Sequence, residues 1–298
     1  MIKGLVAALR LLLVAFVMSA CLTTPARTAE TIDASLREEI HTVPVAAASA
    51  TIVVTTYRPS GSGPFPWIVM SHGTATTAEA NRKIGRYRAL TPIREWVKRG
   101  YAVIVPVRRG YGASGGDTFG DSYGTCKSPD FRRAGEGAAV DVLATIEWAK
   151  TQRDLDRQRW LLVGQSAGGF ASIYTASKHP DGLVAVLAFA PGRGGRPDTY
   201  PGLPCLPELM ARLFASIAPD IAVPVLWFYA ENDVFIGPAA ARLWFDSFRK
   251  AGGRGDFVML PPFPENRGHG VYPSTTGIPL WTAAVSTFFR AQQISLPF

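Results

Sequence analysis

The feature that most constrains this chain is a short apolar run, residues 160–163, that leads into the pattern Gly164-Gln-Ser-Ala-Gly168. The run predicts a buried strand, and residues 170–178 after the pattern are typical of a helix. A serine in so sharp a strand-to-helix turn projects its hydroxyl above the sheet, and glycines suit the close approach of strand and helix. The pattern predicts a nucleophile elbow at Ser166, with the N–H of Ala167 placed to stabilise an oxyanion. The alternative is a tight βα turn without chemistry.

Apolar segments and segments of helical periodicity alternate from residue 66 to the end of the chain. The expected strands are 51–57, 66–70, 101–107, 160–164, 183–190, 223–230 and 257–261, and the expected helices are 87–99, 134–151, 170–178, 238–251 and 278–291. The first of these strands ends at an Arg-Pro pair and is predicted to be an edge strand. The alternation predicts an α/β fold, a mostly parallel central sheet with helices on both faces.

The composition fits one large domain. The 298 residues are 47% hydrophobic and show no internal repeat or linker, so residues 45–298 are predicted to form one domain. The formal net charge is +8, but only 18% of the residues are charged and the arginines are scattered. This pattern does not favour a nucleic-acid partner, and nothing in the sequence indicates the oligomeric state.

The first 21 residues are predicted to be an export signal. Lys3 and Arg10 precede an apolar stretch, residues 11–18, that is short for a membrane span and is followed by small residues. Residues 18–21, Met-Ser-Ala-Cys, resemble a bacterial lipobox, in which Cys21 would be lipidated and would anchor the protein to a membrane. A plain cleaved signal and an uncleaved anchor are the alternatives. Residues 22–44 are predicted to be a tether, and the expected location is the periplasm or cell envelope.

Export changes the interpretation of the other two cysteines. If Cys21 is removed or lipidated, Cys126 and Cys205 remain as a pair, and an oxidising compartment favours a disulfide between them. Their spacing does not indicate a metal site. Each lies in an irregular stretch after a strand, so a bridge would tie the loops 112–131 and 191–213 at the rim of a pocket. The alternative is two free buried cysteines.

A serine hydroxyl needs a base, and the chain has four histidines. His269 lies between two glycines in a loop after the last expected strand, so it is the predicted base; a surface-loop histidine is the alternative. His179 at the end of the elbow helix is expected to be a cap, and His41 lies in the N-terminal lead.

The carboxylate that orients the base should follow an earlier strand. Residues 230–233, Ala-Glu-Asn-Asp, come directly after one. Asp233 is favoured over Glu231 because it lies deeper in the turn, although an ordinary Asx turn would also suit it. The resulting order Ser166, Asp233, His269 is that of α/β-hydrolases.

One glycine pattern imitates a dinucleotide fingerprint. Gly110-x-Gly112-x-x-Gly115 follows a strand, and Asp130 comes twenty residues after Gly110. That fingerprint requires the glycines to open a helix, whereas a loop rich in Gly, Ser and Asp follows here. The sequence therefore predicts no nucleotide, and neither a metal nor an organic cofactor is expected.

From about residue 45 onward the chain resembles an α/β-hydrolase, nearest the dienelactone-hydrolase-like and prolyl-oligopeptidase-like branch. The resemblance is carried by His72-Gly73, Arg109-Gly-Tyr-Gly112, Asp156-Arg157, the elbow, the Asp233 turn and Gly268-His269. It implies that the N–H of Thr74 is the second oxyanion donor beside Ala167, and that His72 is structural. Dienelactone hydrolases proper have a cysteine nucleophile, and prolyl oligopeptidases carry a propeller for which this chain has no room.

These observations predict an exported serine esterase that cleaves a small-molecule carboxylic ester through a Ser-His-Asp triad and an acyl-enzyme. The alternatives are a peptidase or amidase of the same fold, and a non-catalytic envelope lipoprotein that serves as a binding module. The substrate is not encoded in an obvious way. Arg193 and Arg196 in the second rim loop could meet an acidic substrate or could simply be solvated.

Overall fold

The computed structural model describes residues 31–264 and 268–298. The predicted export signal, including Cys21, and most of the predicted tether up to residue 30 lie outside the described residues. Within the described part, no helix has the length and apolar character needed to cross a membrane.

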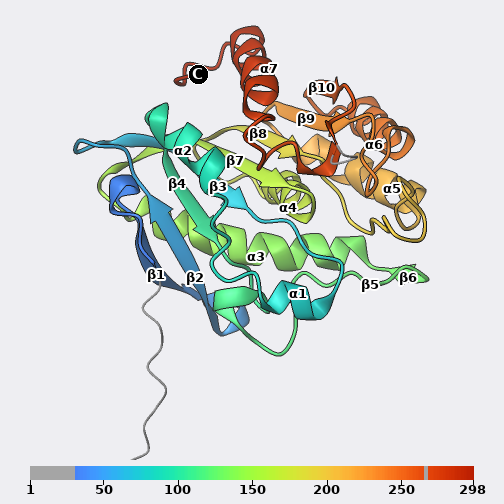
Figure 1. Ribbon diagram of the computed structural model, residues 1–298, viewed down its shortest axis with the longest axis horizontal. Coiled ribbons are helices and arrows are strands. Elements are labelled where there is room, and N and C mark those ends of the chain that lie inside the picture. Colours follow the sequence, from blue (N-terminus) through green and yellow to red (C-terminus); the bar gives the residue numbers. More distant parts are fainter. Residues whose placement is uncertain (1–30, 265–267) are drawn as a thin grey trace, which may run out of the picture. The chain divides into compact units, whose positions relative to one another are not determined.

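Eight strands of the described chain form one sheet in the order β1-β2-β4-β3-β7-β8-β9-β10 (Figure 1). They are β1 (Glu39–Val45), β2 (Ala50–Tyr57), β3 (Phe65–Ser71), β4 (Ala102–Pro106), β7 (Leu155–Gln165), β8 (Leu183–Phe189), β9 (Val225–Ala230) and β10 (Gly255–Leu260). β2 is antiparallel to both of its neighbours, and every pairing from β4 to β10 is parallel. The predicted α/β fold with a mostly parallel sheet is confirmed.

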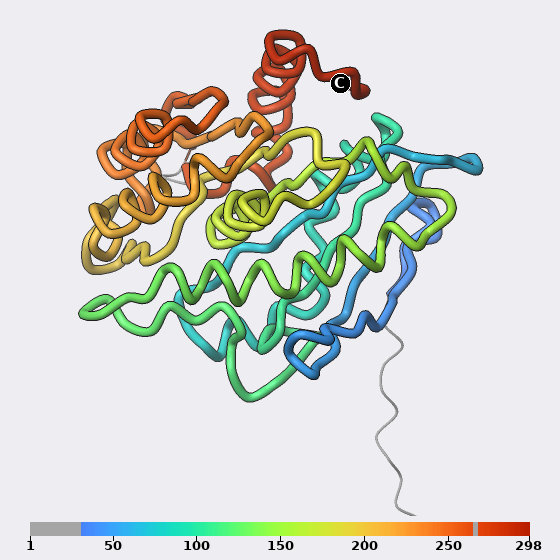
Figure 2. The backbone as a smooth tube through the Cα atoms, turned by 180° about the vertical axis from the view of Figure 1, so that it is seen from behind, coloured from blue at the N-terminus to red at the C-terminus, as the bar shows by residue number. Residues whose placement is uncertain are grey.

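Helices cover both faces of this sheet (Figures 1 and 2). They are α1 (Ala78–Arg82), α2 (Leu90–Lys98), α3 (Phe131–Lys150), α4 (Ala167–Ala176), α5 (Pro207–Ile217), α6 (Pro238–Lys250) and α7 (Ile278–Ala291). Apolar side chains of α3, α4, α5 and α6 share one buried cluster with one face of the strands. Those of α2 and α7 share a second cluster with the opposite face. Two cores on the two sides of one sheet explain why the central strands are apolar throughout.

The predicted domain boundary at residue 45 is wrong. Residues 32–298 form one unit, and β1 pairs with β2 along its whole length, from Glu39 opposite Thr56 to Val45 opposite Ala50. The edge strand is therefore β1, and β2 is an inner strand. The sequence pattern of this segment indicates a tether because only Val43 and Val45 of β1 are buried, which leaves a weak apolar signal, and because it contains a proline, which an edge strand tolerates.

Part of the predicted second rim loop is also helical. Residues 207–217 form α5, with Pro207 in its first turn, where proline is tolerated because no intrahelical bond needs its missing N–H. The Gly- and Pro-rich sequence just before it hid the helical period. In the first rim loop, β5 (Gly124–Thr125) and β6 (Ser128–Pro129) form a small hairpin outside the main sheet.

A buried ion cluster ties the start of the domain to the segment before α2. The Glu38 carboxylate accepts hydrogen bonds from Arg86 at 2.6 Å, from Arg88 at 2.7 and 2.8 Å, and from the Tyr57 hydroxyl at 3.1 Å. Burial opposes ionisation, but the bonds from Arg88, from the Asp33 N–H and from Arg86 lower the pKa of Glu38 to about 2. We call Glu38, Arg86, Arg88 and Tyr57 the Glu38 cluster.

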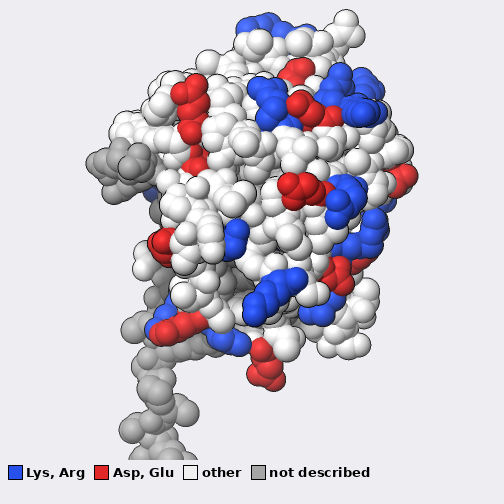
Figure 3. Space-filling view, turned by 90° about the vertical axis from the view of Figure 1, so that its right-hand side faces the viewer, with Lys and Arg blue, Asp and Glu red and all other residues white. Residues whose placement is uncertain are grey.

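Charge on the surface is mixed. On the face shown in Figure 3, Lys and Arg side chains lie interspersed with Asp and Glu and with uncharged surface. This face therefore presents no continuous field of one sign to a partner.

Candidate active site

The residues of interest gather where the parallel strands end. Thr74 follows β3, Arg108 follows β4, Ser166 follows β7, Arg193 follows β8, Asp233 follows β9 and His269 follows β10. The carboxyl ends of parallel strands meet at one edge of a sheet, which is where open α/β sheets bind their ligands.

Ser166 occupies a strained turn between β7 and α4. Its φ of 56° and ψ of −123° lie in a region that residues with a side chain rarely adopt. The N–H of Ser166 donates to Phe189 at 2.8 Å, which fixes the turn against β8. A Cβ on Gly164 would lie 2.7 Å from the Gly169 nitrogen, and one on Gly168 would lie 2.6 Å from the His72 oxygen. Both positions therefore require glycine.

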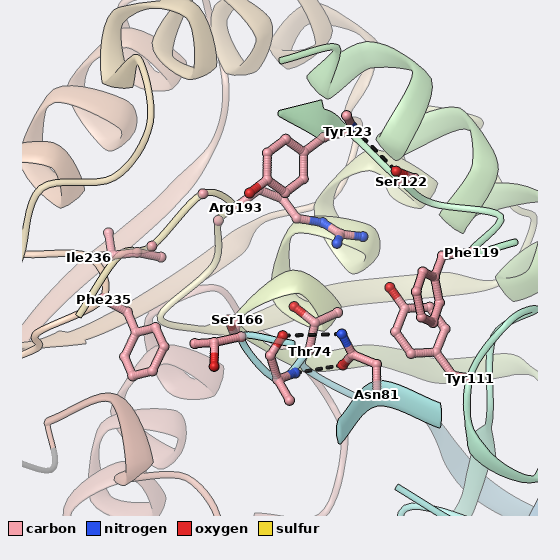
Figure 4. Close-up of a pocket in the computed structure, with 16 residues that line it drawn as sticks. Thr74, Asn81, Tyr111, Phe119, Ser122, Tyr123, Ser166, Arg193, Phe235 and Ile236 are labelled. Atoms are coloured by element: carbon pink, nitrogen blue, oxygen red, sulfur yellow. Dashed lines mark hydrogen bonds between the residues drawn. The ribbon is translucent and has the colours of Figure 1, made fainter. Parts of the chain in front are cut away.

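The loop after β3 lies against this turn. A Cβ on Gly73 would lie 3.3 Å from the Cβ of Ser166, and Thr74 lines the same cavity as Ser166. The buried Asn81 side chain of α1 accepts from the Ala75 N–H at 2.7 Å and donates to the Ala75 oxygen at 3.1 Å (Figure 4). These two hydrogen bonds hold the loop after β3 in place. No motif in the sequence marks Asn81, so it was not predicted.

The His72 ring supports the same loop through two hydrogen bonds. It is fully buried, its Nδ1 lies 2.7 Å from the Gly73 oxygen, and its Nε2 accepts from the Arg108 N–H at 3.1 Å. Burial, reinforced by the Arg108 charge, holds the pKa of His72 well below its ordinary value. The ring is therefore neutral at physiological pH and joins the loops after β3 and β4, in line with the structural role that the family resemblance implies.

Asp233 and His269 are hydrogen-bonded, with 2.8 Å between Oδ2 and Nδ1. Asp233 is buried, and its Oδ1 accepts from the N–H groups of Phe235 at 2.8 Å and Ile236 at 3.0 Å. One carboxylate thus both closes an Asx turn and orients the imidazole. Glu231 is exposed at the start of the turn, so the structure brings Asp233 rather than Glu231 to the histidine.

The histidine loop is tied to the serine turn through the backbone. The side-chain amide of Gln165 donates to the His269 oxygen at 2.6 Å, and the Phe235 ring stacks on the imidazole at 4.4 Å. Within the described residues, no hydrogen bond joins the Ser166 hydroxyl to the His269 ring. Gln165 occupies a variable position of the elbow pattern, which is why the sequence did not single it out. Of the other histidines, His41 contacts Thr56 in β2, away from these loops.

A cavity of about 200 Å³ opens beside Ser166. Figure 4 shows Ser166, Thr74, Asn81 and Phe235 around it, with Arg193 from the loop after β8 above them. Among the described residues that line this cavity, Arg193 carries the one charged side chain.

A second buried ion cluster stands behind the cavity wall. Asp121 accepts from the Arg108 Nε at 2.9 Å, from the Tyr111 hydroxyl at 2.6 Å and from Arg193. Burial opposes ionisation, but the charges of Arg193 and Arg108 hold the pKa of Asp121 below its ordinary value. Burial raises the pKa of Tyr111 to about 12, so its hydroxyl stays a donor. We call Asp121, Arg108, Arg193 and Tyr111 the Asp121 cluster, which the sequence did not predict.

The predicted disulfide between Cys126 and Cys205 is present, with 5.1 Å between the Cα atoms. Cys205 donates its N–H to the Gly194 oxygen at 2.8 Å, and a Cβ on Gly194 would lie 2.9 Å from that of Cys205. Gly194, the residue after Arg193, lines the cavity, and so does Gly124 of the hairpin. The bridge therefore joins the two rim segments. In residues 31–264 and 268–298 there is no group of three His, Cys, Asp or Glu side chains that could hold a metal ion.

This fold and the serine turn above its strand ends define a protein of the α/β-hydrolase class, with a serine hydrolase-type fold. The chain belongs to the X-Pro dipeptidyl-peptidase family S15. The sequence model of this family matches residues 49–211, more than half of the 298 residues. The predicted kinship with α/β-hydrolases is confirmed. No curated protein matches the sequence.

Solved structures of similar fold include esterases and peptidases. An esterase of Pyrococcus furiosus is 15% identical with a TM-score of 0.59, over 86% of this chain and 91% of that one. A dienelactone hydrolase-like promiscuous phosphotriesterase from metagenomic libraries is 16% identical with a TM-score of 0.56, over 85% and 98%. The acylaminoacyl peptidase of Pyrococcus horikoshii is 14% identical with a TM-score of 0.58, over 87% and 41%. At these identities the similarity is one of fold.

Proposed function

We propose that this protein is an exported serine hydrolase that cleaves carboxylic esters with Ser166 as nucleophile, His269 as base and Asp233 as the orienting carboxylate. The observation that carries the proposal is the 2.8 Å hydrogen bond between Asp233 and His269, on a loop that is tied to the serine turn by the side chain of Gln165, the residue before Ser166. A nucleophile, a base and a buried acid on neighbouring loops are what acyl transfer requires.

The reaction proceeds in two steps. Ser166 attacks the ester carbonyl as His269 takes its proton, and Asp233 stabilises the imidazolium that forms. The N–H groups of Ala167, at the start of α4, and of Thr74 stabilise the tetrahedral oxyanion. His269 then protonates the departing alcohol, and water attacks the acyl-enzyme by the same route. The serine and histidine come into hydrogen-bond contact when substrate binds, as catalytic bonds often tighten only in the complex.

Esters are favoured over peptides by the charge of the cavity. A dipeptidyl peptidase must hold the protonated amino terminus of its substrate, and a cationic side chain in the cavity repels it. Arg193 supplies that positive charge beside Ser166. The second candidate is a peptidase of the same fold, which the description of the S15 family favours. A non-catalytic binding module is the least supported of the candidate functions, because the chain retains all three residues of the proposed triad.

Export is supported by the N-terminal apolar stretch and by the disulfide. Lipidation of Cys21 and anchoring to a membrane are part of the same proposal. Mass spectrometry of the mature N-terminus tests them, because a diacylglycerol mass on Cys21 would be lost in Cys21→Ala.

Replacement of Ser166 tests the mechanism. In Ser166→Ala, ester turnover should fall by roughly 10⁴-fold or more with the fold intact, because the acyl-enzyme cannot form. A fluorophosphonate should label the wild type at Ser166 alone. Asp233→Asn should lower kcat by about 10⁴-fold, and the matched control Glu231→Gln should stay within about twofold. Labelling at another serine, or the reverse order of the two acid variants, would refute these assignments.

Substrate panels separate esters from peptides. We expect p-nitrophenyl esters of graded acyl length to be hydrolysed and X-Pro and aminoacyl p-nitroanilides to be resistant. A higher kcat/KM for X-Pro anilides than for any ester would make the second candidate the correct one.

A further inference from the structure

The Asp121 cluster contains more positive than negative charge. It holds one carboxylate and two guanidinium groups, a surplus of one positive charge, and Asp121 and Arg108 are fully buried. Within the described residues, Arg108 Nη2 and Arg193 Nε are buried without a hydrogen-bond partner. A surplus buried charge with unsatisfied donors is costly unless another anion approaches it.

Arg193 and Tyr111 are the members of this cluster that line the cavity, and Arg193 is the charged one of the two. Its side chain is 5% exposed, and it lines the same cavity as Ser166 and Thr74 (Figure 4). Asp121 accepts from its Nη2, which leaves further N–H groups of the guanidinium for a second acceptor. A ligand in the cavity would therefore meet a positive group that water barely reaches.

The rest of the cluster holds Arg193 in place. Asp121 is itself fixed by Arg108 and by the Tyr111 hydroxyl, and Arg108 also donates to the His72 oxygen at 2.9 Å. The next residue, Gly194, packs on Cys205 of the disulfide. A cation held on two sides in this way is preorganised for an anion, so little conformational entropy is lost when one binds.

We propose that Arg193 determines specificity by binding a carboxylate that the substrate carries in addition to its scissile ester, so that the preferred substrates are half-esters of dicarboxylic acids or similar anionic esters. This inference rests on the proposed function and extends it. A carboxylate is the fitting anion because its single negative charge balances the single surplus positive charge, whereas a phosphate dianion would exceed it.

Paired substrates measure this preference. We expect kcat/KM for p-nitrophenyl half-esters of succinate, glutarate and adipate to exceed that for the same p-nitrophenyl esters with the free carboxylate methylated. The ratio should be about 10- to 100-fold at the best chain length, because a hydrogen bond to a charged group contributes this much. In Arg193→Gln this ratio should fall toward one, and in Arg193→Lys it should stay in between, because the charge remains but the planar fork is lost. Arg196→Gln, three residues further along, is the matched control and should keep the wild-type ratio. A wild-type ratio near one overturns the inference while the esterase proposal stands.

Binding without turnover separates the two proposals. In Ser166→Ala, calorimetry should show monomethyl glutarate binding about tenfold or more tightly than dimethyl glutarate, and the added substitution Arg193→Gln should abolish the difference. If the wild type hydrolyses no ester but this selective binding is found, the anion site stands and the esterase proposal fails. Equal binding of the two compounds overturns the anion site. If Arg193→Gln does not fold, the wild-type ratio and Arg193→Lys decide the matter.

Discussion

The two buried ion clusters are built from the same parts. Each surrounds one carboxylate, Glu38 or Asp121, with two arginines and one tyrosine hydroxyl. They differ in where the surplus positive charge lies. In the Glu38 cluster the Arg88 side chain is 27% exposed and shares its charge with water. In the Asp121 cluster the two arginines are 0% and 5% exposed, and the one that reaches any open space faces the cavity beside Ser166.

The difference teaches how to distinguish a structural ion cluster from a functional one. An arginine pair that is solvated on one side needs no further partner, because water screens the excess charge. An arginine pair enclosed against a cavity leaves a charge that only a ligand can balance. Composition and pairing alone do not separate the two cases, whereas the exposure of the second arginine does.

The largest effect is expected when the central carboxylates are neutralised. Asp121→Asn should lower the free energy of unfolding by about 3–5 kcal/mol, because it leaves two enclosed guanidinium groups without a counter-charge. Glu38→Gln should cost less, about 1–3 kcal/mol, because Arg88 can turn to water. Urea unfolding of both variants measures the order. A greater loss for Glu38→Gln would break the comparison.

Removal of the disulfide should loosen the rim of the cavity near the Asp121 cluster and leave the Glu38 cluster unchanged. Cys126 and Cys205 are 79 residues apart, so Cys126→Ala with Cys205→Ala should lower the free energy of unfolding by about 2–4 kcal/mol. It should also weaken the preference for anionic esters, because Gly194 beside Arg193 packs on the bridge. The readouts are urea unfolding with and without reductant, in which only the wild type should respond to reductant. A preference that stays intact in the double variant would show that the cluster alone holds Arg193.

Acid should weaken both clusters, in different pH ranges. Because the pKa of Glu38 is lowered from 4.5 to about 2 in the folded protein, the stability that this carboxylate contributes is complete above pH 4.5 and is lost as the pH falls toward 2. The pKa of Asp121 is also lowered, so its contribution is lost at pH values below its ordinary 3.8. Melting temperatures measured from pH 7 to pH 2 should fall less steeply between pH 4.5 and 3.8 in Glu38→Gln than in the wild type. In Asp121→Asn the melting temperature should fall between pH 4.5 and 3.8 as it does in the wild type.

The smallest effect is expected at the solvated arginine. Arg88→Gln should lower the free energy of unfolding by no more than about 1 kcal/mol, because a partly exposed ion pair contributes little. Esterase kcat/KM should be unaffected, since the Glu38 cluster does not line the cavity. Arg108→Gln is the enclosed counterpart and should cost several times more. Equal losses in the two variants would show that exposure is not the distinguishing property.

The sequence predicted those features that a continuous stretch of chain encodes. The central strands are covered on both faces, so β8 and β9 are uninterrupted apolar runs, and Ser166 sits in a local glycine pattern. β1 was missed because only two of its seven residues are buried, and α5 was hidden by the Gly- and Pro-rich segment before it.

The supports of the site escaped prediction for a different reason. Asp121 and Arg193 are 72 residues apart, and Gln165 meets the His269 backbone across 104. Such contacts depend on how loops from different strands meet above the sheet, and no periodicity or motif in one sequence reports that. Asn81 likewise acts through the backbone of Ala75, which leaves no trace in the residue types around it.

The backbone conformation of Ser166 lowers the stability of the fold at the residue that is proposed to be the nucleophile. A φ of 56° with a ψ of −123° suits glycine, and a residue with a side chain held there costs of order 1–3 kcal/mol. Directed evolution for heat resistance alone would therefore tend to replace this serine, and under the proposed mechanism each such variant would be more stable and inactive. Selection schemes for this scaffold must reward turnover in every round.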